Sequence, residues 1–298
     1  MTRLFVIAEP DVERRACRAA TAAATAAASL ELAPSIEEAD VVLVGPRQPA
    51  ELRAALPQAR RVRWIHALAA GVESLPLGEI HARGIVLTNS RGLYGDALAE
   101  FAIAAMLWFA KDLRRLDRNQ AARRWEPFDV ERLEGRTAGI IGYGGIGRAV
   151  GRRAEALGMP VLGARRNDPV DQLIASSDYL VLATPLTAGT RGLMSRQRLA
   201  TMPSRAVLIN VGRGALVDEM ALVDELARIR GAALDVFETE PLPETSPLWG
   251  LDNVLISPHS ADHTADSHER TLDFFLQNLE RFEKGEPLQN VVDLARGY

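Results

Sequence analysis

Lysine is nearly absent from this chain of 298 residues. Of its 35 basic residues only Lys111 and Lys284 are lysines, and arginine supplies the rest. A P-loop requires a Gly-Lys-Ser or Gly-Lys-Thr tripeptide after its glycines, and the sequence contains neither. No tyrosine is followed by a lysine four residues later, which excludes the Tyr-Lys pair of short-chain dehydrogenases. A mechanism that needs an active-site lysine therefore has two candidates at most.

Cysteine, long apolar runs and an excess of basic charge are also missing. The single cysteine, Cys17, cannot form an internal disulfide and has no nearby histidine, so we expect an inert thiol in a reducing compartment. The apolar start ends at Glu9, too short for a signal peptide, and the run Phe101–Ala110 spans about half a bilayer. With 39 acidic residues the net charge is −4, which disfavours nucleic-acid binding. We expect a cytoplasmic protein that binds neither nucleic acid nor membrane.

Strand-like and helical segments alternate along the chain, which is typical of an α/β protein with parallel sheets. A first series contains an Ala-rich helix over Asp11–Ala28 and strands over Leu4–Ala8, Ala39–Val44, Val62–Ile65 and Ile85–Thr88. A second series contains strands over Thr137–Ile141, Met159–Ala164, Tyr179–Ala183, Ala206–Val211, Gly231–Phe237 and Asn253–Ser257. The fold class predicted is two Rossmann-like or flavodoxin-like domains with doubly wound parallel sheets.

The length suggests two domains, and the last residues suggest how they are connected. Long helices are expected over about 96–115 and 265–283, and the tail that follows is too short to form a domain. We expect this tail to return to the first domain, with both long helices at the junction. The prediction is a discontinuous substrate domain, residues 1–93 plus 284–298, into which a cofactor domain, residues 94–283, is inserted.

A glycine-rich loop follows the first strand of the second series and precedes a helical segment. Such a strand–loop–helix frame makes a GxGxxG pattern indicate a dinucleotide site. The first glycine permits the turn, the second lets the backbone approach a pyrophosphate, and the third allows close helix packing. The helix N-terminus offers free N–H groups to the anion. The predicted cofactor-binding residues are Gly142, Tyr143, Gly144, Gly145, Ile146 and Gly147.

The end of the next strand predicts which cofactor is preferred. An acidic residue here would accept hydrogen bonds from the ribose of NAD, whereas arginine can bind the 2′-phosphate of NADP. The strand ends in Arg165-Arg166, so we predict a preference for NADP, with NAD possible. The alternative is that both arginines only face solvent and that Asp168 binds the ribose.

Polar residues gather where the remaining strands of this series end, and ligands of doubly wound folds bind at that edge. Thr184-Pro185, Asn210–Gly214, Asp235–Glu240 and Ser257–His259 occupy these positions. An arginine, a glutamate and a histidine thus converge beside the cofactor. Reduction of a 2-oxo acid needs this set: a cation for the carboxylate, a proton donor for the carbonyl, and a carboxylate that keeps the donor protonated.

These residues make the chain resemble the D-isomer-specific 2-hydroxyacid dehydrogenases, a family that includes glyoxylate/hydroxypyruvate reductases, phosphoglycerate dehydrogenase and formate dehydrogenase. The resemblance covers nearly the whole chain and is closest to the glyoxylate/hydroxypyruvate type. It is carried by WIHALAAG (64–71), the glycine loop, TPLTAGTRGL (184–193), NVGRGALVDE (210–219), GAALDVFETEPLPETSPLW (231–249) and the Ser257–His259 segment.

The resemblance implies a role for each matching residue. Arg213 would bind and polarise the substrate, His259 would be the general acid, and Glu240 would raise the pKa of His259. Asp235 would contact the nicotinamide carboxamide, and backbone amides near Ala70 and Gly71 would bind the substrate carboxylate. Further cofactor contacts are implied for Thr184, Pro185, Val211 and Gly212. The implied reaction is NAD(P)H-dependent reduction of a small 2-oxo acid to the D-2-hydroxy acid by a homodimer, in which Trp108 is buried or at the dimer contact.

Two departures from the family pattern affect these expectations. The chain is short between Arg166 and Ser177, so the adenosine side of the cofactor site is expected to be more open. After His259 the family has small or apolar residues, but here Asp262 and His263 follow. Substrate preference and pH optimum are therefore open, and a phosphoglycerate-like or bulky 2-oxo acid is an alternative substrate.

Two other functions compete with this interpretation. His259, His263, His268, Asp262, Asp266 and Glu269 are dense enough to suggest a metallo-hydrolase, but Pro258 argues against one helix carrying both His259 and His263. We therefore predict no metal. A cofactor-sensing regulator is disfavoured because a sensor needs no proton donor. His66 and His81 are expected to pack in the core or on the surface, and Arg91 and Tyr94 to lie in the substrate cleft or at a hinge.

Overall fold

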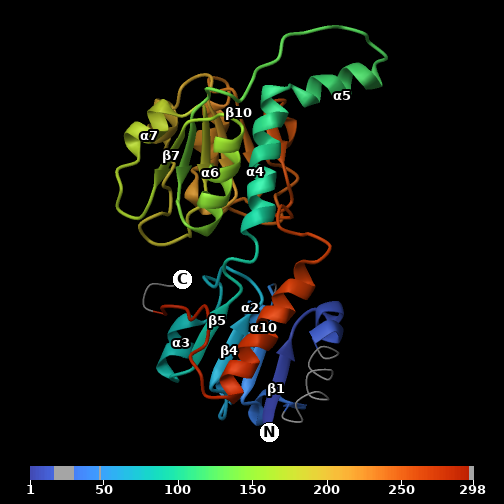
Figure 1. Cartoon of the computed structure of the whole chain (residues 1–298), viewed down its shortest axis with the longest axis vertical. Coiled ribbons are helices and arrows are strands. Elements are labelled where there is room, and N and C mark those ends of the chain that lie inside the picture. Colours follow the sequence, from blue (N-terminus) through green and yellow to red (C-terminus); the bar gives the residue numbers. More distant parts are fainter. Residues whose placement is uncertain (17–29, 47, 295–298) are drawn as a thin grey trace. The chain divides into compact units, whose positions relative to one another are not determined.

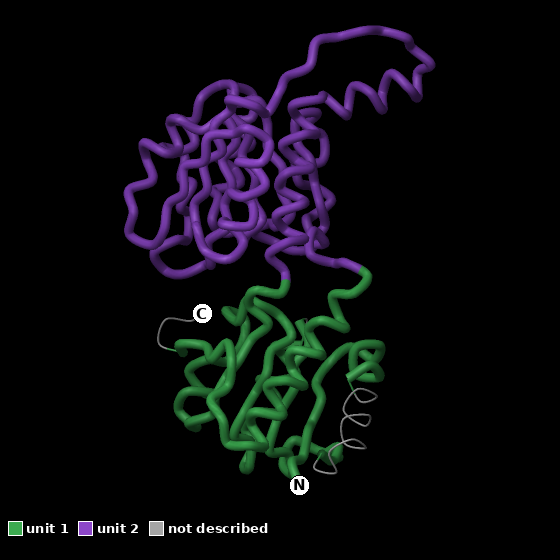
Figure 2. The backbone as a smooth tube through the Cα atoms, viewed as in Figure 1, with its two compact units in different colours: residues 1–93, 265–298 green, residues 94–264 purple. Residues whose placement is uncertain are grey.

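The computed structural model describes residues 1–16, 30–46 and 48–294, and divides the chain into two compact units (Figure 2). Unit 1 comprises Met1–Leu93 and Ala265–Tyr298, and unit 2 comprises Tyr94–Thr264. Cys17 and most of the expected helix over 11–28 lie outside the described residues, although residues 10–16 are helical. None of the described helices has the length and apolar character that crossing a membrane requires.

Unit 1 is built on a parallel five-stranded sheet of order β2-β1-β3-β4-β5 (Figure 1). Its strands are β1 (Thr2–Ile7), β2 (Leu30–Leu32), β3 (Val41–Val44), β4 (Trp64–Ala67) and β5 (Val86–Asn89). Its helices are α2 (Pro49–Ala55), α3 (Leu77–Ala82) and α10 (Ser267–Glu283), with short 3-10 turns at Ile36–Glu38 and Leu56–Gln58. Successive strand residues point to opposite faces. Accordingly, α2 and α3 cover one face and α10 the other.

Unit 2 is built on a parallel six-stranded sheet of order β11-β10-β9-β8-β6-β7. Its strands are β6 (Ala138–Ile141), β7 (Val161–Ala164), β8 (Tyr179–Leu182), β9 (Val207–Asn210), β10 (Gly231–Leu234) and β11 (Val254–Ile256). The helices α4 (Gly95–Ala110) and α6 (Gly145–Ala156) cover one face. The helices α7 (Asp171–Ser176), α8 (Arg196–Thr201) and α9 (Glu219–Glu225) cover the other. The predicted α/β class with two doubly wound parallel sheets is confirmed.

Strand β7 is one of the two edge strands of the sheet in unit 2. Between it and β8 the described chain forms only α7, so no strand pairs with the outer side of β7. Leu162 in this strand is 40% exposed. The segment after Arg166, which is expected from the sequence to be short, thus adds no strand beyond β7. This edge of the sheet is next to the predicted adenosine side.

The helix expected over 96–115 is interrupted. Asp112 has φ +46°, in the left-handed region, and its side chain accepts a hydrogen bond from the Arg115 N–H at 3.3 Å. The left-handed residue ends α4, and its cap begins a second helix, α5 (Leu113–Ala121). Figure 1 shows that α5 and the segment after it project from the body of unit 2.

The division by contacts differs from the expected domains at α10. The expectation placed residues 265–283 with the cofactor domain, but α10 packs on the sheet of unit 1. Its Phe275 stacks on Trp64 of β4 with ring centroids 5.4 Å apart, and Leu272 and Leu279 are buried beside it. The amphipathic pattern predicted a buried face but could not identify the surface that covers it.

Candidate active site

The glycine loop has the local geometry that its motif requires. Gly142 has φ +97°, and a Cβ there would lie 2.6 Å from the Ala183–Thr184 backbone. A Cβ on Gly147 would lie 2.3 Å from the Gly142 carbonyl oxygen, so this glycine permits α6 to approach the strand. By contrast, nothing lies within 4 Å of a Cβ on Gly144 or Gly145. Open space in front of the α6 N-terminus, with its free N–H groups, fits a dinucleotide pyrophosphate.

The Tyr143 side chain lies on the other side of this loop. A Cβ on Gly151 of α6 would meet the Tyr143 hydroxyl at 2.7 Å, and one on Gly163 of β7 would meet its ring at 2.5 Å. The ring therefore fills space between α6 and the edge strand. Only the backbone of Tyr143, a predicted cofactor residue, therefore lies in the loop. Ile146, another predicted cofactor residue, is half-buried in the first turn of α6.

The end of β7 presents two exposed arginines, Arg165 and Arg166. Asp168, the alternative ribose ligand, accepts a hydrogen bond from the Arg165 backbone N–H at 2.7 Å. It thereby closes a turn in which Asn167 has φ +68°. The Asp168 carboxylate thus has a local structural role, and Arg165 and Arg166 are both exposed residues.

The ends of β8 and β9 touch behind Arg213. A Cβ on Gly212 would lie 3.0 Å from the Thr184 carbonyl oxygen, so the Thr184-Pro185 and Val211-Gly212 segments are in contact. Asn210 donates to the Arg213 carbonyl at 2.9 Å, and the Arg213 guanidinium donates to the Gly212 carbonyl at 2.8 Å. These bonds fix the half-buried Arg213 at the carboxyl edge of the sheet.

His259 and Glu240 form a hydrogen-bonded pair at the same edge. The distance from His259 Nδ1 to Glu240 Oε2 is 2.7 Å, and Glu240 Oε1 accepts the Phe237 N–H at 2.9 Å. The hydrogen bond to Glu240 raises the pKa of His259, although burial opposes it. Burial would raise the pKa of Glu240, but the hydrogen bonds from His259 and Phe237 lower it overall. The pair therefore favours a charged imidazolium beside a carboxylate, with Nε2 left for a substrate.

Asp235 holds the loop that carries His259. This side chain is 1% exposed, and its Oδ1 accepts hydrogen bonds from the Ser257 hydroxyl at 2.5 Å and from the Ser260 and Ala261 N–H groups at 3.0 Å. Its backbone carbonyl accepts the His259 N–H at 2.8 Å. Sequence reasoning missed this structural role, for which no local pattern gives a signal. The described residues place no donor on Oδ2, which fits an amide of a nicotinamide.

Asp262 and His263 lie just beyond this loop. The Asp262 side chain is 22% exposed, and its Oδ1 lies 3.7 Å from His263 Nε2. Burial raises the pKa of Asp262, while the charges of His263 and His259 lower it. The His263 N–H bonds to the Ser260 carbonyl in a turn, so His259 and His263 do not share a helix. Among described residues, no three His, Cys, Asp or Glu side chains could hold a metal.

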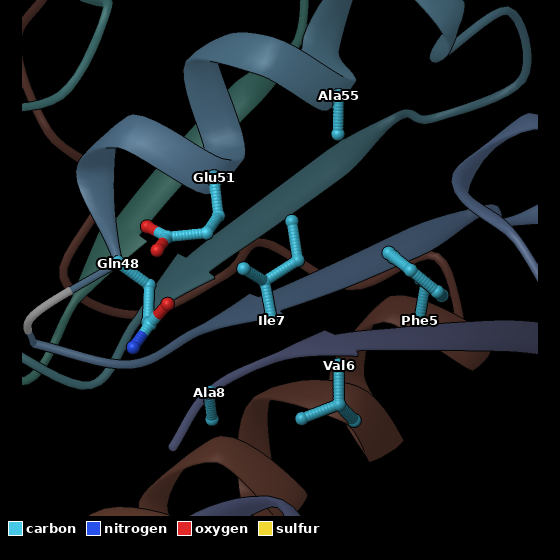
Figure 3. A pocket seen from close by; sticks show the side chains of 7 residues that line it. All are labelled: Phe5, Val6, Ile7, Ala8, Gln48, Glu51 and Ala55. Atoms are coloured by element: carbon cyan, nitrogen blue, oxygen red, sulfur yellow. The ribbon is translucent and has the colours of Figure 1, made fainter. Parts of the chain in front are cut away.

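The remaining predicted residues lie in unit 1. Ala70 and Gly71 follow β4 and are partly exposed. His66 on β4 is fully buried against Trp64 and Phe275, and burial lowers its pKa to about 3. His66 thus packs in the core. Figure 3 shows a hollow at the end of β1, where Phe5 and Ile7 face α2 and Gln48 and Glu51 lie at its polar end; no residue of the predicted site lines it.

Comparison with known proteins places this arrangement in a family. Residues 103–261 match the model of the D-isomer-specific 2-hydroxyacid dehydrogenase NAD-binding domain. The chain is 34% identical to a glyoxylate reductase of Korarchaeum cryptofilum over 79% of this chain and 77% of that protein. It is 31% identical to a D-3-phosphoglycerate dehydrogenase of Methanocaldococcus jannaschii, over 91% of this chain and 55% of that protein.

A solved structure supports both the fold and the family that the sequence comparison indicates. A D-isomer-specific 2-hydroxyacid dehydrogenase from Xanthobacter autotrophicus, determined with NADPH and MES, superposes with a TM-score of 0.85. It is 30% identical, and the superposition covers 100% of this chain and 99% of that one. The chain therefore belongs to the D-isomer-specific 2-hydroxyacid dehydrogenase family and is an NAD(P)-dependent oxidoreductase.

Proposed function

We propose that the protein reduces a small 2-oxo acid of the glyoxylate/hydroxypyruvate type to the D-2-hydroxy acid, with NADPH preferred over NADH. The observation that carries this proposal is the 2.7 Å hydrogen bond between His259 and Glu240 at the sheet edge that also holds Arg213. When bound, the nicotinamide supplies the hydride. In the proposed mechanism, His259 Nε2 gives its proton to the substrate carbonyl oxygen, and the charge of Glu240 keeps that proton available.

Substrate binding would use charge and backbone amides. Arg213 would bind the carboxylate and polarise the adjacent carbonyl, and the N–H groups of Ala70 and Gly71 would contribute from unit 1. The name of the Korarchaeum relative supports a glyoxylate-type substrate, whereas the Methanocaldococcus relative keeps a phosphorylated substrate as the alternative. Asp262 favours the first, because its carboxylate, which interacts electrostatically with His259, would in its charged form repel the additional charge of a phosphate.

A panel of substrates tests the proposal. We expect kcat/KM to be highest for glyoxylate or hydroxypyruvate with NADPH, and lower for 3-phosphohydroxypyruvate and for bulky 2-oxo acids. A maximum with the phosphorylated acid would remove the proposed substrate class. Activity with no 2-oxo acid would remove the proposed function as a whole.

The preference for NADPH is assigned to Arg165 and Arg166. Both are exposed at the end of β7, and one oxygen of the Asp168 carboxylate accepts the Arg165 N–H. The NADPH bound to the Xanthobacter protein is consistent with this proposal. Replacing both arginines with alanine should raise KM for NADPH at least about tenfold, because charge-assisted hydrogen bonds to the 2′-phosphate are lost, and leave KM for NADH nearly unchanged. An equal effect on both cofactors would contradict the assignment.

We also propose that the functional form is a homodimer in the cytoplasm, with unit 1 as the substrate domain and unit 2 as the cofactor domain. The projecting arm, residues 113–132, supports the dimer (Figure 1). It presents Leu116, Trp125 and Val130 with 46%, 97% and 53% exposure. Trp108 packs edge-to-face on Phe109 at 4.7 Å within unit 2, which favours its assignment to the core.

A further inference from the structure

In the loop after β4, two backbone carbonyls accept hydrogen bonds from the same neighbouring segment. The Ser90 N–H donates to the Ala69 carbonyl at 3.1 Å, and the Asn89 side-chain amide donates to the Ala70 carbonyl at 2.7 Å. Residues 89 and 90 are adjacent, at and just after the end of β5. Both carbonyls therefore point towards the segment that follows this strand.

These bonds also set the direction of two amides. In a trans peptide the C=O and the following N–H point in opposite directions. The bond to the Ala69 carbonyl therefore turns the Ala70 N–H away from residues 89 and 90, and the bond to the Ala70 carbonyl does the same for the Gly71 N–H. Neither N–H has an acceptor among the described residues. Two adjacent N–H groups that share a direction and have no acceptor can together bind one anion.

Asn89 is itself held by the far end of the chain. It is 3% exposed, its N–H donates to the Asn290 carbonyl at 3.2 Å, and its Oδ1 accepts the Arg91 N–H at 3.3 Å. The Asn290 side chain donates to the carbonyls of Asn89 and Arg91 at 3.2 and 2.7 Å. Val292 continues this pairing through an N–H bond of 2.8 Å to Leu87. Residues 290–292 thus clamp the Asn89 segment.

Ser90 is held by a buried hydrogen-bond network. Trp64 Nε1 donates to the Thr88 hydroxyl at 2.8 Å, and that hydroxyl shares a hydrogen bond of 2.7 Å with His66 Nδ1. Burial lowers the pKa of His66 to about 3, so the ring is neutral, and its Nε2 lies 3.4 Å from the Ser90 hydroxyl. Ser90 donates to the Ala67 carbonyl at 3.3 Å. Every polar group in this network has a partner, so the segment is rigid.

We propose that Asn89, held by Asn290, is a positioning residue that orients the Gly71 N–H towards the substrate carboxylate. This inference rests on the proposed function, in which Ala70 and Gly71 bind that carboxylate. Under this inference, residues 290–292 act on the substrate site through their hydrogen bonds to the Asn89 segment.

The test compares a substrate that carries the carboxylate with one that does not. In N89A the Gly71 peptide is free to rotate, so KM for glyoxylate should rise about ten- to a hundredfold, as expected for a hydrogen bond to a charged group, with kcat nearly kept. For methyl glyoxylate, a neutral ester, kcat/KM should change less than about twofold. In N290G glycine keeps the positive φ of +54° and only the side chain is lost, so KM for glyoxylate should rise about two- to tenfold.

N253A is the matched control, because Asn253 also donates from Nδ2 to a backbone carbonyl, that of Leu226, at 2.8 Å, but in unit 2. Its KM for glyoxylate should equal that of the wild type. The Kd for NADPH should be unchanged in all three variants. If N89A does not fold, the same comparison of glyoxylate with methyl glyoxylate in N290G tests the inference. Equal losses for ester and acid, or an unchanged KM for glyoxylate, would overturn the inference. Failure of the wild type to reduce any 2-oxo acid would instead refute the proposed function.

Discussion

His259 has a backbone conformation that non-glycine residues rarely adopt, with φ +52°. The strain is held by the N–H bond to the Asp235 carbonyl and by the bonds that Asp235 Oδ1 accepts from the loop after His259. The imidazole is thereby directed to Glu240 while 44% of its side chain stays exposed. A strained backbone that the surrounding hydrogen bonds hold in place often occurs at functional sites, which agrees with the proposed role of His259.

The pH dependence of reduction should report the pKa of His259. A general acid must be protonated, so kcat/KM should fall as the pH rises through this raised pKa. In E240Q the carboxylate charge is lost, the pKa of His259 falls, and the alkaline limb should move to lower pH. The measurement is kcat/KM for glyoxylate from about pH 5 to pH 9. An alkaline limb at the same pH in E240Q would show that Glu240 does not raise the pKa of the proton donor.

Removing the imidazole provides the companion measurement. H259Q should lower kcat by about a hundredfold to ten-thousandfold, because the proton donor is lost, and should abolish the alkaline limb. The Kd for NADPH should stay near that of the wild type, since the glycine loop is untouched. Turnover at the wild-type rate would exclude His259 from the chemistry.

At the scale of elements, the glycine loop combines two different demands on glycine. Gly147 is required by packing, since a Cβ there would meet the Gly142 carbonyl, whereas Gly144 faces open space. Of these two glycines of the motif, Gly147 is therefore needed for stability and Gly144 for cofactor binding.

Alanine at these two positions should separate stability from binding. G147A should lower Tm by several degrees, because α6 must move away from the strand. G144A should leave Tm nearly unchanged and raise the Kd for NADPH at least about tenfold, because the methyl group occupies space that the pyrophosphate needs. G250A, which also meets nothing within 4 Å, is the control for both. Unaltered cofactor binding in G144A would place the pyrophosphate elsewhere.

At the scale of the whole molecule, the arm is an exposed apolar feature of the described part of the chain. Arg114 ties the base of α5 to the Leu251 carbonyl at 3.2 Å, and Lys111 donates to the Glu131 carbonyl at 2.6 Å. These bonds fix the base of the arm, while Trp125 within the arm is 97% exposed. A large indole in water is costly, and a second copy of the chain is the proposed cover.

Charge at the arm should weaken the dimer. L116D together with W125D should raise the dimer dissociation constant at least about thirtyfold, as expected when a buried aromatic anchor is lost. Sedimentation equilibrium of the wild type and the double variant measures this, and K284A, a substitution of an exposed lysine in unit 1, is the control. Identical masses at every concentration would show that the arm is not the interface.

Sequence reasoning recovered most elements of the fold and predicted which polar residues lie at the strand ends. The ten expected strands all form, while the three-residue β2 and the break at Asp112 were missed because neither leaves a periodic pattern. Arg213, Glu240 and His259 were each found at the end of a strand, since parallel strands bring their carboxyl ends to one edge. The bonds that hold them, from Asn210, Phe237 and Asp235, were not predicted.

The sequence by itself determined the α/β class, the glycine loop and the identity of the polar residues at strand ends, because periodicity and glycine stereochemistry are local properties. Only the tertiary structure decided that α10 packs on unit 1, that Asp235 carries the His259 loop, and that Asn290 clamps Asn89. Each of these depends on residues distant in the chain, and which of many equivalent apolar faces or amides meet is fixed only when the whole chain has packed.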